Sequence, residues 1–174
     1  MTDPMTLAEA SRSDGRAVYD MLQEMGPGES GFTNTAFDIP YEGFGEYVAS
    51  LERMAAGVGL KESHVPMTTY WLKADGRPIG IGRLRHRLND ALLHCGGHIG
   101  FCIRPSERGN GYGTALLGLI LDKARDMGIR KALLTCNVDN VGSRKVIEHN
   151  GGVLERVDEA RQWCYYWIDC GTEE

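Results

Sequence analysis

The sequence predicts a mixed α/β fold in which a mostly antiparallel central sheet is flanked by helices. Three observations lead to this prediction: two helical segments lie in the first third of the chain, turn-separated strands fill the middle, and strand and helix alternate afterwards. Alternation of that kind indicates helices packed against a sheet. Because no repeat, low-complexity tract or linker interrupts the 174 residues, we expect one domain over residues 1–174.

The first part of the chain is expected to contain one short strand and two helices. Ser13 and Asp14 are residue types that cap helices, and apolar residues follow them at the helical period. The expected elements are a strand over residues 6–10, a helix ending at residues 26–28, a polar irregular loop over residues 31–40 and a helix over residues 41–56. Four aromatic residues are candidates for an apolar pocket, with core packing as the alternative: Phe32, Phe37, Tyr41 and Phe44.

An antiparallel hairpin is expected in the middle of the chain. Residues 68–73 and 78–88 are typical of strands joined by the tight turn Asp75-Gly76, and a second turn is expected over residues 92–97. The return strand carries a basic run that consists of Arg83, Arg85, His86 and Arg87. Because alternate residues of a strand share a face, part of this run either binds a carboxylate or forms a solvated strand face.

A glycine-rich loop separates a strand from a helix in the second half of the chain. The expected strand over residues 99–103 is followed by Gly109, Gly111 and Gly113, and the apolar residues of 114–127 have helical spacing. The start of a helix presents backbone N–H groups and the positive end of the helix dipole, and glycines let an anion approach closely. The loop therefore predicts an anion site, and a pyrophosphate is the expected ligand group.

Two common phosphate loops do not fit this sequence. A Walker loop requires a lysine before its Ser or Thr, but Gly113 stands directly before Thr114. A dinucleotide fingerprint requires its third glycine at the position of Thr114. A glycine-rich turn without any ligand is the remaining alternative to an anion site.

The loop also matches the pattern Arg-x-x-Gly-x-Gly, through Arg108, Gly111 and Gly113. In this it resembles motif A of the GNAT superfamily of acyl-CoA-dependent N-acyltransferases, where the loop holds the pyrophosphate of coenzyme A. Residues 131–137 resemble the next strand of that family, and residues 139–152 resemble its asparagine-containing loop, following helix and closing turn. The order of elements along nearly the whole chain is similar to the GNAT fold, and short motifs resemble those of a bacterial subgroup of predicted acetyltransferases.

The resemblance implies an N-acetyltransferase that transfers acetyl from acetyl-CoA to a primary amine of a small molecule or protein, by direct attack in a ternary complex. Acetyl-CoA is the implied co-substrate, and backbone groups of the central strand and of the glycine loop hold it in the family. The residues that match the family's cofactor-binding positions are Phe101, Cys102, Ile103, Arg108, Gly109, Asn110, Gly111, Tyr112, Gly113, Thr114, Asn137, Asn140, Ser143 and Lys145.

Two residues are candidates for acid–base catalysis. Many family members carry a tyrosine that protonates the departing thiolate, but the matching position here is Ile147. Ser143 is therefore the candidate acid, with Tyr165 and Tyr166 as alternatives. His98 lies nearest to the glutamate that acts as base in some members, and a histidine with a pKa of about 6.5 suits an amine substrate. A local hydrogen bond at the end of the strand is the alternative role for His98.

Two other functions are compatible with parts of the sequence. The absence of a tyrosine at Ile147 is also what a non-catalytic acyl-CoA-binding or sensing module would show. A protein that binds nucleotide phosphates is disfavoured by the missing lysine before Thr114. Turnover of acetyl-CoA with an amine distinguishes the enzyme from the module, and binding of ATP would indicate the third function.

Composition and charge narrow the expected partners. A net charge of −5 disfavours nucleic-acid binding, and no apolar run approaches the ~20 residues of a membrane span. No secretory signal is visible, so we expect a cytoplasmic protein. The five cysteines lack CxxC spacing and His94-Cys95-x-x-His98 is not a zinc spacing, so we expect neither disulfides nor a metal site. Edge strands of such a sheet allow a homodimer.

Overall fold

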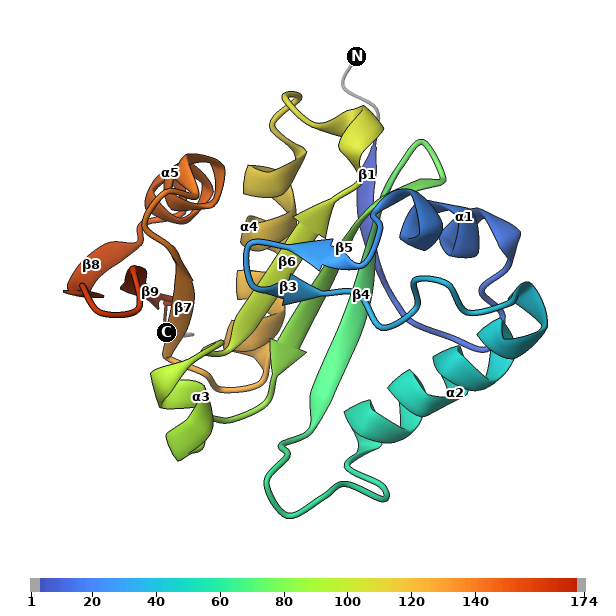
Figure 1. Ribbon diagram of the computed structural model, residues 1–174, viewed down its shortest axis with the longest axis horizontal. Coiled ribbons are helices and arrows are strands. Elements are labelled where there is room, and N and C mark those ends of the chain that lie inside the picture. Colours follow the sequence, from blue (N-terminus) through green and yellow to red (C-terminus); the bar gives the residue numbers. More distant parts are fainter. Residues whose placement is uncertain (1–3, 172–174) are drawn as a thin grey trace.

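The structure is a computed structural model that describes residues 4–171. None of the helices in this part of the chain is long and apolar enough to cross a membrane. The elements shown in Figure 1 are, in chain order, β1 (Met5–Glu9), α1 (Arg16–Glu24), β2 (Gly28–Glu29), β3 (Phe32–Thr33), α2 (Tyr41–Ala56), β4 (Met67–Ala74), β5 (Arg77–Arg85), α3 (Asp90–His94), β6 (Ile99–Ile103), the 3₁₀ turn η1 (Pro105–Glu107), α4 (Tyr112–Asp126), β7 (Lys131–Asn137), α5 (Val141–His149), β8 (Val153–Asp158) and β9 (Trp163–Asp169).

The strands form two sheets and one small hairpin. Four strands pair in the order β1-β4-β5-β6, three pair in the order β7-β9-β8, and β2 pairs with β3. Each of these pairs is antiparallel. Helices flank the sheets (Figure 1), so the predicted mixed α/β fold with a mostly antiparallel sheet is confirmed. The single sheet that we expected is nevertheless divided in two, because β6 and β7 are joined at one end without a ladder along the described strands.

The joint between β6 and β7 consists of a few short contacts. The His98 N–H donates to the carbonyl of Leu133 (2.7 Å), and the Leu133 N–H donates to His98 Nδ1 (2.9 Å). Beside them the Gly96 N–H donates to the Thr135 hydroxyl (3.0 Å). We call these four residues the clamp. Beyond the clamp the two strands diverge, as Figure 1 shows.

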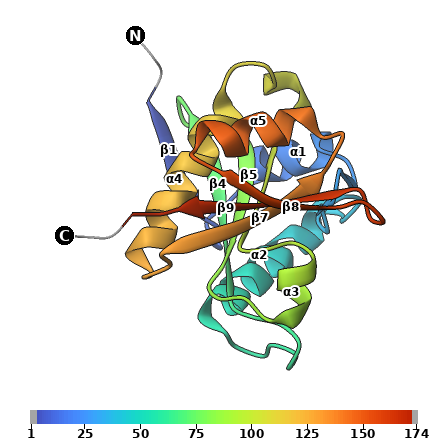
Figure 2. The same cartoon turned by 90° about the vertical axis from the view of Figure 1, so that its left-hand side faces the viewer.

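The two faces of the four-stranded sheet pack against different helices. Helices α1 and α2 cover one face and α4 covers the other (Figures 1 and 2). On β4, Trp71 packs with α1 and α2, while its neighbours Tyr70 and Leu72 pack with α4, as period-two alternation requires. Residues of β7 and β9 belong to the same core as α4. This shared core fixes α4 against both sheets and therefore fixes where the helix begins.

The start of α1 differs from the expectation. Its N-cap is Gly15, and no side chain caps the helix. Asp14 instead accepts hydrogen bonds from the Ser11 N–H (2.8 Å) and from the indole N–H of Trp71 (2.7 Å). A buried indole requires an acceptor, so Asp14 is held by the core. The prediction that Ser13 or Asp14 caps this helix is wrong.

Two loops contain structure that the sequence patterns did not indicate. The return strand β5 ends at Arg85, before the expected residue 88, because the chain turns into α3. Asn89 caps α3 by accepting a hydrogen bond from the Leu92 N–H (2.9 Å), so the turn expected over residues 92–97 begins with a helix. The loop expected to be irregular over residues 31–40 contains β3, which pairs with β2 just before it, and both strands are too short to show alternation.

Gly97 has a backbone conformation that the clamp requires. Its φ is +58°, and a Cβ added there would lie 2.8 Å from the Leu133 carbonyl carbon. We therefore expect Gly97→Ala to lower the free energy of unfolding by at least about 2 kcal/mol, because left-handed strain and the steric contact add. Urea denaturation measures this value.

Gly128→Ala is the matched control for this substitution. Gly128 also has a positive φ, +81°, but a Cβ there would meet nothing within 4 Å. Its substitution should lower the free energy of unfolding by about 1 kcal/mol, from strain alone. Equal losses in the two variants would show that the clamp tolerates a side chain at Gly97.

Candidate functional site

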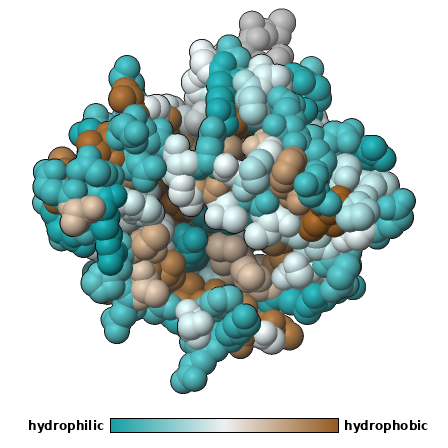
Figure 3. Space-filling model, viewed as in Figure 1, coloured by the Kyte–Doolittle hydropathy of each residue, from teal (hydrophilic) through white to brown (hydrophobic). Residues whose placement is uncertain are grey.

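Two adjoining cavities lie between the diverging strands. The loop cavity, of about 420 Å³, is bounded by the glycine loop (residues 108–114), β6 and the start of α5. The strand cavity, of about 220 Å³, lies nearer the clamp and is bounded by β3, β5, β6 and β7. Figure 3 shows this side of the molecule hollowed near its middle. The residues that line both cavities, and so join them into one cleft, are Ser30, Phe32, Phe101, Asn140 and Ser143.

The glycine loop leaves the first N–H groups of α4 without a cap. Gly111 is the N-cap of this helix, has a φ of +80°, and offers no side-chain acceptor. A Cβ at Gly109 or Gly111 would meet nothing within 4 Å, so both glycines border open space. Uncapped N–H groups at the positive end of a 15-residue helix form a site for an anion.

Arg108 is held over the loop cavity by two elements. Its Nε donates to the carbonyl of Ile103 at the end of β6 (3.1 Å), and its other side forms an ion pair with Glu29 of β2. Glu29 also lines the loop cavity. This partner could not be recognised from the sequence, because Glu29 lies far from Arg108 along the chain, in a hairpin without a periodic pattern.

The start of α5 closes the opposite side of the cleft. Asn140 is the N-cap of α5, and its Oδ1 accepts a hydrogen bond from the Ser143 N–H (3.2 Å). This bond places Ser143 in the first turn of α5, at the junction of the two cavities. The tyrosines named as alternative acids lie elsewhere: Tyr165 donates to the His94 carbonyl (2.6 Å), and Tyr166 donates to a Glu148 carboxylate oxygen (2.8 Å). Neither tyrosine lines either cavity.

Most of the residues expected in the cofactor site line the loop cavity, and three do not. Asn110 turns its side chain back to the carbonyl of Glu107 (3.1 Å). Asn137 and Lys145 lie outside the lining of both cavities. The residues that do line the loop cavity are Phe101, Cys102, Ile103, Arg108, Gly109, Gly111, Tyr112, Gly113, Thr114, Asn140 and Ser143.

The backbone of β6 presents alternate residues to the cleft. The carbonyl of His98 and the N–H of Arg104 bond to β5, so the even-numbered residues between them face β5 as well. Phe101 and Ile103 therefore turn their backbone groups away from β5, toward the gap, and the bond from Arg108 to the Ile103 carbonyl agrees with this. The backbone of Cys102 pairs with β5, while its side chain lines the loop cavity.

His98 belongs to the clamp and lines neither cavity. Its side chain is buried, its Nδ1 accepts from the Leu133 N–H, and burial together with the nearby charge of Arg85 lowers its pKa to about 4. These contacts match the alternative role, a local hydrogen bond at the end of the strand. The assignment of His98 as a catalytic base stays a prediction, and the geometry does not favour it.

The aromatic residues proposed for an apolar pocket divide between two roles. Phe32 lines both cavities, whereas Phe44 is buried in the core of α1 and α2. Among residues 4–171 no group of three or more His, Cys, Asp or Glu side chains lies close enough together to hold a metal ion.

The sequence matches the Acetyltransferase (GNAT) family over residues 32–151, about two-thirds of the chain. The chain belongs to this family. GNAT proteins are acyltransferase enzymes, and the strand, glycine loop and helix described above lie within the matched residues. Comparison with curated protein sequences finds no match.

Solved structures of other GNAT proteins share the fold. RimL, a ribosomal L7/L12 α-N-protein acetyltransferase in complex with coenzyme A, superposes with a TM-score of 0.72 at 18% identity, covering 98% of this chain and 100% of that one. The microcin C7 self-immunity acetyltransferase MccE, with acetyl-CoA and AMP, gives 0.70 at 15%, covering 96% and 93%. YncA of Salmonella typhimurium, with acetyl-CoA, gives 0.65 at 14%, covering 97% and 95%. At these sequence identities the similarity establishes a shared fold and does not extend to the substrates of these proteins.

The depressed pKa of His98 predicts a pH dependence of stability in this GNAT protein. Between pH 6.5 and about pH 4 the unfolded chain binds a proton at His98 that the folded chain does not, so stability falls as the pH falls through this window. The loss attributable to His98 should reach about 3 kcal/mol at its lower end. Urea denaturation at a series of pH values measures it.

His98→Asn is the variant that isolates this contribution. The Asn side chain keeps an acceptor for the Leu133 N–H and has no titratable ring. Its free energy of unfolding should therefore change less between pH 6.5 and pH 4 than that of the unmodified protein. An identical slope in both proteins would contradict the buried, neutral histidine.

Proposed function

We propose that this GNAT protein is an N-acetyltransferase that transfers acetyl from acetyl-CoA to a primary amine by direct attack in a ternary complex. The proposal rests on the continuous cleft. The uncapped start of α4 borders the loop cavity, and the loop cavity is continuous with the strand cavity. Two adjoining sites are what a reaction between two bound substrates requires. The acetyl-CoA and coenzyme A bound to other GNAT structures support the same cofactor here.

The loop cavity fits the pyrophosphate and pantetheine parts of acetyl-CoA. The N–H groups at the start of α4 would bind the pyrophosphate. The pyrophosphate would replace Glu29 as the partner of Arg108, which would then add charge-assisted hydrogen bonds to it. The backbone groups of Phe101 and Ile103 face the gap, where they can bind the pantetheine amides and the thioester carbonyl. An N–H at this place would also stabilise negative charge that develops on the carbonyl oxygen.

Acetyl-CoA supplies an activated acyl group, and the chain supplies position and charge stabilisation. The amine nitrogen forms the new C–N bond, the C–S bond breaks, and coenzyme A leaves as the thiolate, which takes up a proton. Ser143 lies at the junction of the cavities in the first turn of α5, where its hydroxyl and the helix dipole can both stabilise that thiolate. Burial raises the pKa of the Cys102 thiol, which therefore stays protonated, and this favours direct attack over an acylated cysteine.

The alternative function, a non-catalytic acyl-CoA sensor, rests on Ile147, which is buried and lines the strand cavity. The presence of a second cavity beside the cofactor loop favours the enzyme over the sensor.

We further propose that residues 1–174 act as one domain, because a single apolar core contains residues from both sheets and from α4.

Binding of the cofactor can be tested at the glycine loop. Acetyl-CoA and coenzyme A at about 100 times their dissociation constant should each add about 2.7 kcal/mol of stability, whereas ATP should add less. Gly111→Asp should abolish this gain, because Asp tolerates a positive φ but places a carboxylate in the anion site. Thermal denaturation with each ligand provides the measurement.

Gly128→Asp is the control for the loop variant. Gly128 has a similar φ and open surroundings, but it follows α4 at the opposite end of the helix from the loop. Its stabilisation by acetyl-CoA should equal that of the unmodified protein. Stabilisation by ATP alone, or an equal response of the two aspartate variants, would remove the basis of the cofactor assignment.

Ser143 can be tested by separating kcat from KM. Ser143→Ala should lower kcat for thiol release by about 10²-fold and leave the KM for acetyl-CoA nearly unchanged, because the hydroxyl acts on the leaving group. Ser143→Thr keeps a hydroxyl and should recover part of the rate. A Ser143→Ala enzyme with the full kcat would exclude Ser143 as the acid.

A further inference from the structure

Two arginines of β5 face the strand cavity without an acidic partner among residues 4–171. Arg83 and Arg85 stand two residues apart, so they share a face of the strand, and both line the cavity. His86 lies on the other side and shares a hydrogen bond with Thr68 (2.7 Å). The solvated strand face that was one interpretation of this basic run therefore does not describe Arg83 and Arg85, which are partly buried.

The lack of a partner distinguishes these two arginines from others in the chain. Eight arginines, most of them well exposed, form ion pairs with Asp or Glu, whereas Arg83 and Arg85 form none with the residues that the structure describes. Burial lowers the pKa of both guanidinium groups, and the charge of Arg83 lowers the pKa of Arg85 further. Arginine nevertheless stays charged in proteins, so two desolvated positive charges line one cavity.

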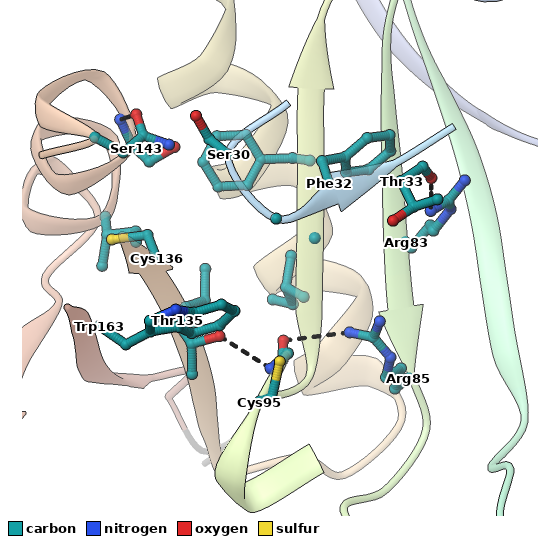
Figure 4. Close-up of a pocket in the computed structure, with 18 residues that line it drawn as sticks. Ser30, Phe32, Thr33, Arg83, Arg85, Cys95, Thr135, Cys136, Ser143 and Trp163 are labelled. Carbon is teal, nitrogen blue, oxygen red and sulfur yellow. Dashed lines mark hydrogen bonds between the residues drawn. The ribbon is translucent and has the colours of Figure 1, made fainter. Parts of the chain in front are cut away.

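Neutral groups position both guanidinium groups. Arg83 donates to the carbonyl of Thr33 (2.7 Å) and lies over the ring of Phe32, 4.5 Å from its centroid. Arg85 donates from Nη1 to the carbonyls of Gly96 and Gly97 (3.2 Å each). Figure 4 shows the two arginines on the same side of the cavity, opposite Cys136 and Trp163. Each guanidinium has five N–H donors, so these contacts leave donors available to a ligand.

The rest of the cavity wall provides no negative charge. Its lining consists of apolar, hydroxyl, thiol and amide side chains and contains no Asp or Glu. Buried charges are normally paired, and two like charges in one small cavity repel each other. An anionic group of a ligand would satisfy both arginines at once.

We infer that the acceptor is a small amine that also carries a carboxylate, and that Arg83 and Arg85 bind this carboxylate in the strand cavity. The inference rests on the proposed function, because it names the second substrate of that reaction. Arg83 pairs across the sheet with Gly100, the neighbour of Phe101, and the two arginines and Phe101 line the same cavity. A cavity of about 220 Å³ is smaller than the ~300–1,000 Å³ of pockets for drug-sized ligands.

The small volume of the strand cavity, which Arg83, Arg85 and Phe101 all line, favours an amino acid over a longer amine. In an amino acid the amine and the carboxylate are separated by one or two carbons, which fits a carboxylate held beside the thioester. A guanidinium also matches a carboxylate through two parallel hydrogen bonds, which orients the amine as well as binding it.

The experiment measures thiol release from acetyl-CoA with matched pairs of amines. Glycine, β-alanine and the standard L-amino acids are each compared with the corresponding carboxamide, which keeps the amine and lacks the charge. The best amino acid should exceed its carboxamide in kcat/KM by about 10²-fold, because the carboxamide leaves buried cations unpaired. Arg83→Gln and Arg85→Gln should each raise the KM for that amino acid by at least about 10-fold and reduce its advantage over the carboxamide. Arg85→Lys should recover part of it.

The controls separate this inference from the proposed function. Arg87→Gln removes a neighbouring exposed arginine that lines neither cavity, and its KM for the amino acid should not change. Stabilisation by acetyl-CoA should be the same in every variant, because the loop cavity is intact.

Each outcome decides one of the two ideas. If acetyl-CoA stabilises the protein while carboxamides react as well as amino acids, or no amino acid reacts, the inference is overturned and the cofactor assignment stands. If acetyl-CoA does not bind, the proposed function fails. The anion site is then judged by thermal stabilisation of the unmodified protein with amino acids alone, compared with their carboxamides. A reaction that prefers amino acids but does not depend on Arg83 or Arg85 also overturns the inference about these two arginines.

Discussion

The clamp between β6 and β7 sets the geometry of the cleft and of the helices around it. Two hydrogen bonds between His98 and Leu133 join the sheets at one end, and Gly97 allows the backbones to approach there. Because the strands diverge beyond this point, the backbone groups on one edge of β6 have no strand partner. If the sheet continued from β6 to β7, those backbone groups would be hydrogen-bonded to β7 and could not bind a ligand. The cleft of this GNAT protein is therefore a consequence of a ladder that stops early.

Two helices, α4 and α5, begin at this cleft. The uncapped start of α4 and the Asn140-capped start of α5 both border the cleft, so two positive helix ends face the place where phosphate and thiolate charge would be held. The core shared by both sheets holds α4 in that position. The order strand, loop, helix thus brings backbone donors together without a single cationic side chain, and Arg108 adds one.

The sequence determined the local parts of the site more readily than its long-range parts. The glycine loop and α4 were predictable because the glycines, the turn residues and the helical period lie within about twenty consecutive residues. Glu29 could not be predicted as the partner of Arg108, since a two-residue strand shows no periodicity. Arg83 and Arg85 were recognised as sharing a face, but their burial depends on β3 and on the α3–β6 loop, which pack over them from distant positions. Asp14 was mistaken for a cap because its partner, Trp71, lies on another element.

The β2–β3 hairpin has a consequence for how two ligands would act on each other. It contacts Arg108 through Glu29 and Arg83 through the Thr33 carbonyl, and Phe32 belongs to the wall of both cavities. A molecule that displaces Glu29 from Arg108 removes one attachment of the hairpin. Thermodynamic linkage then requires that any change in affinity that occupancy of one cavity causes at the other be matched by the same factor in the reverse direction, whichever molecule binds first. A hairpin of a few residues is thus the segment through which occupancy of one half of the cleft would affect the other half.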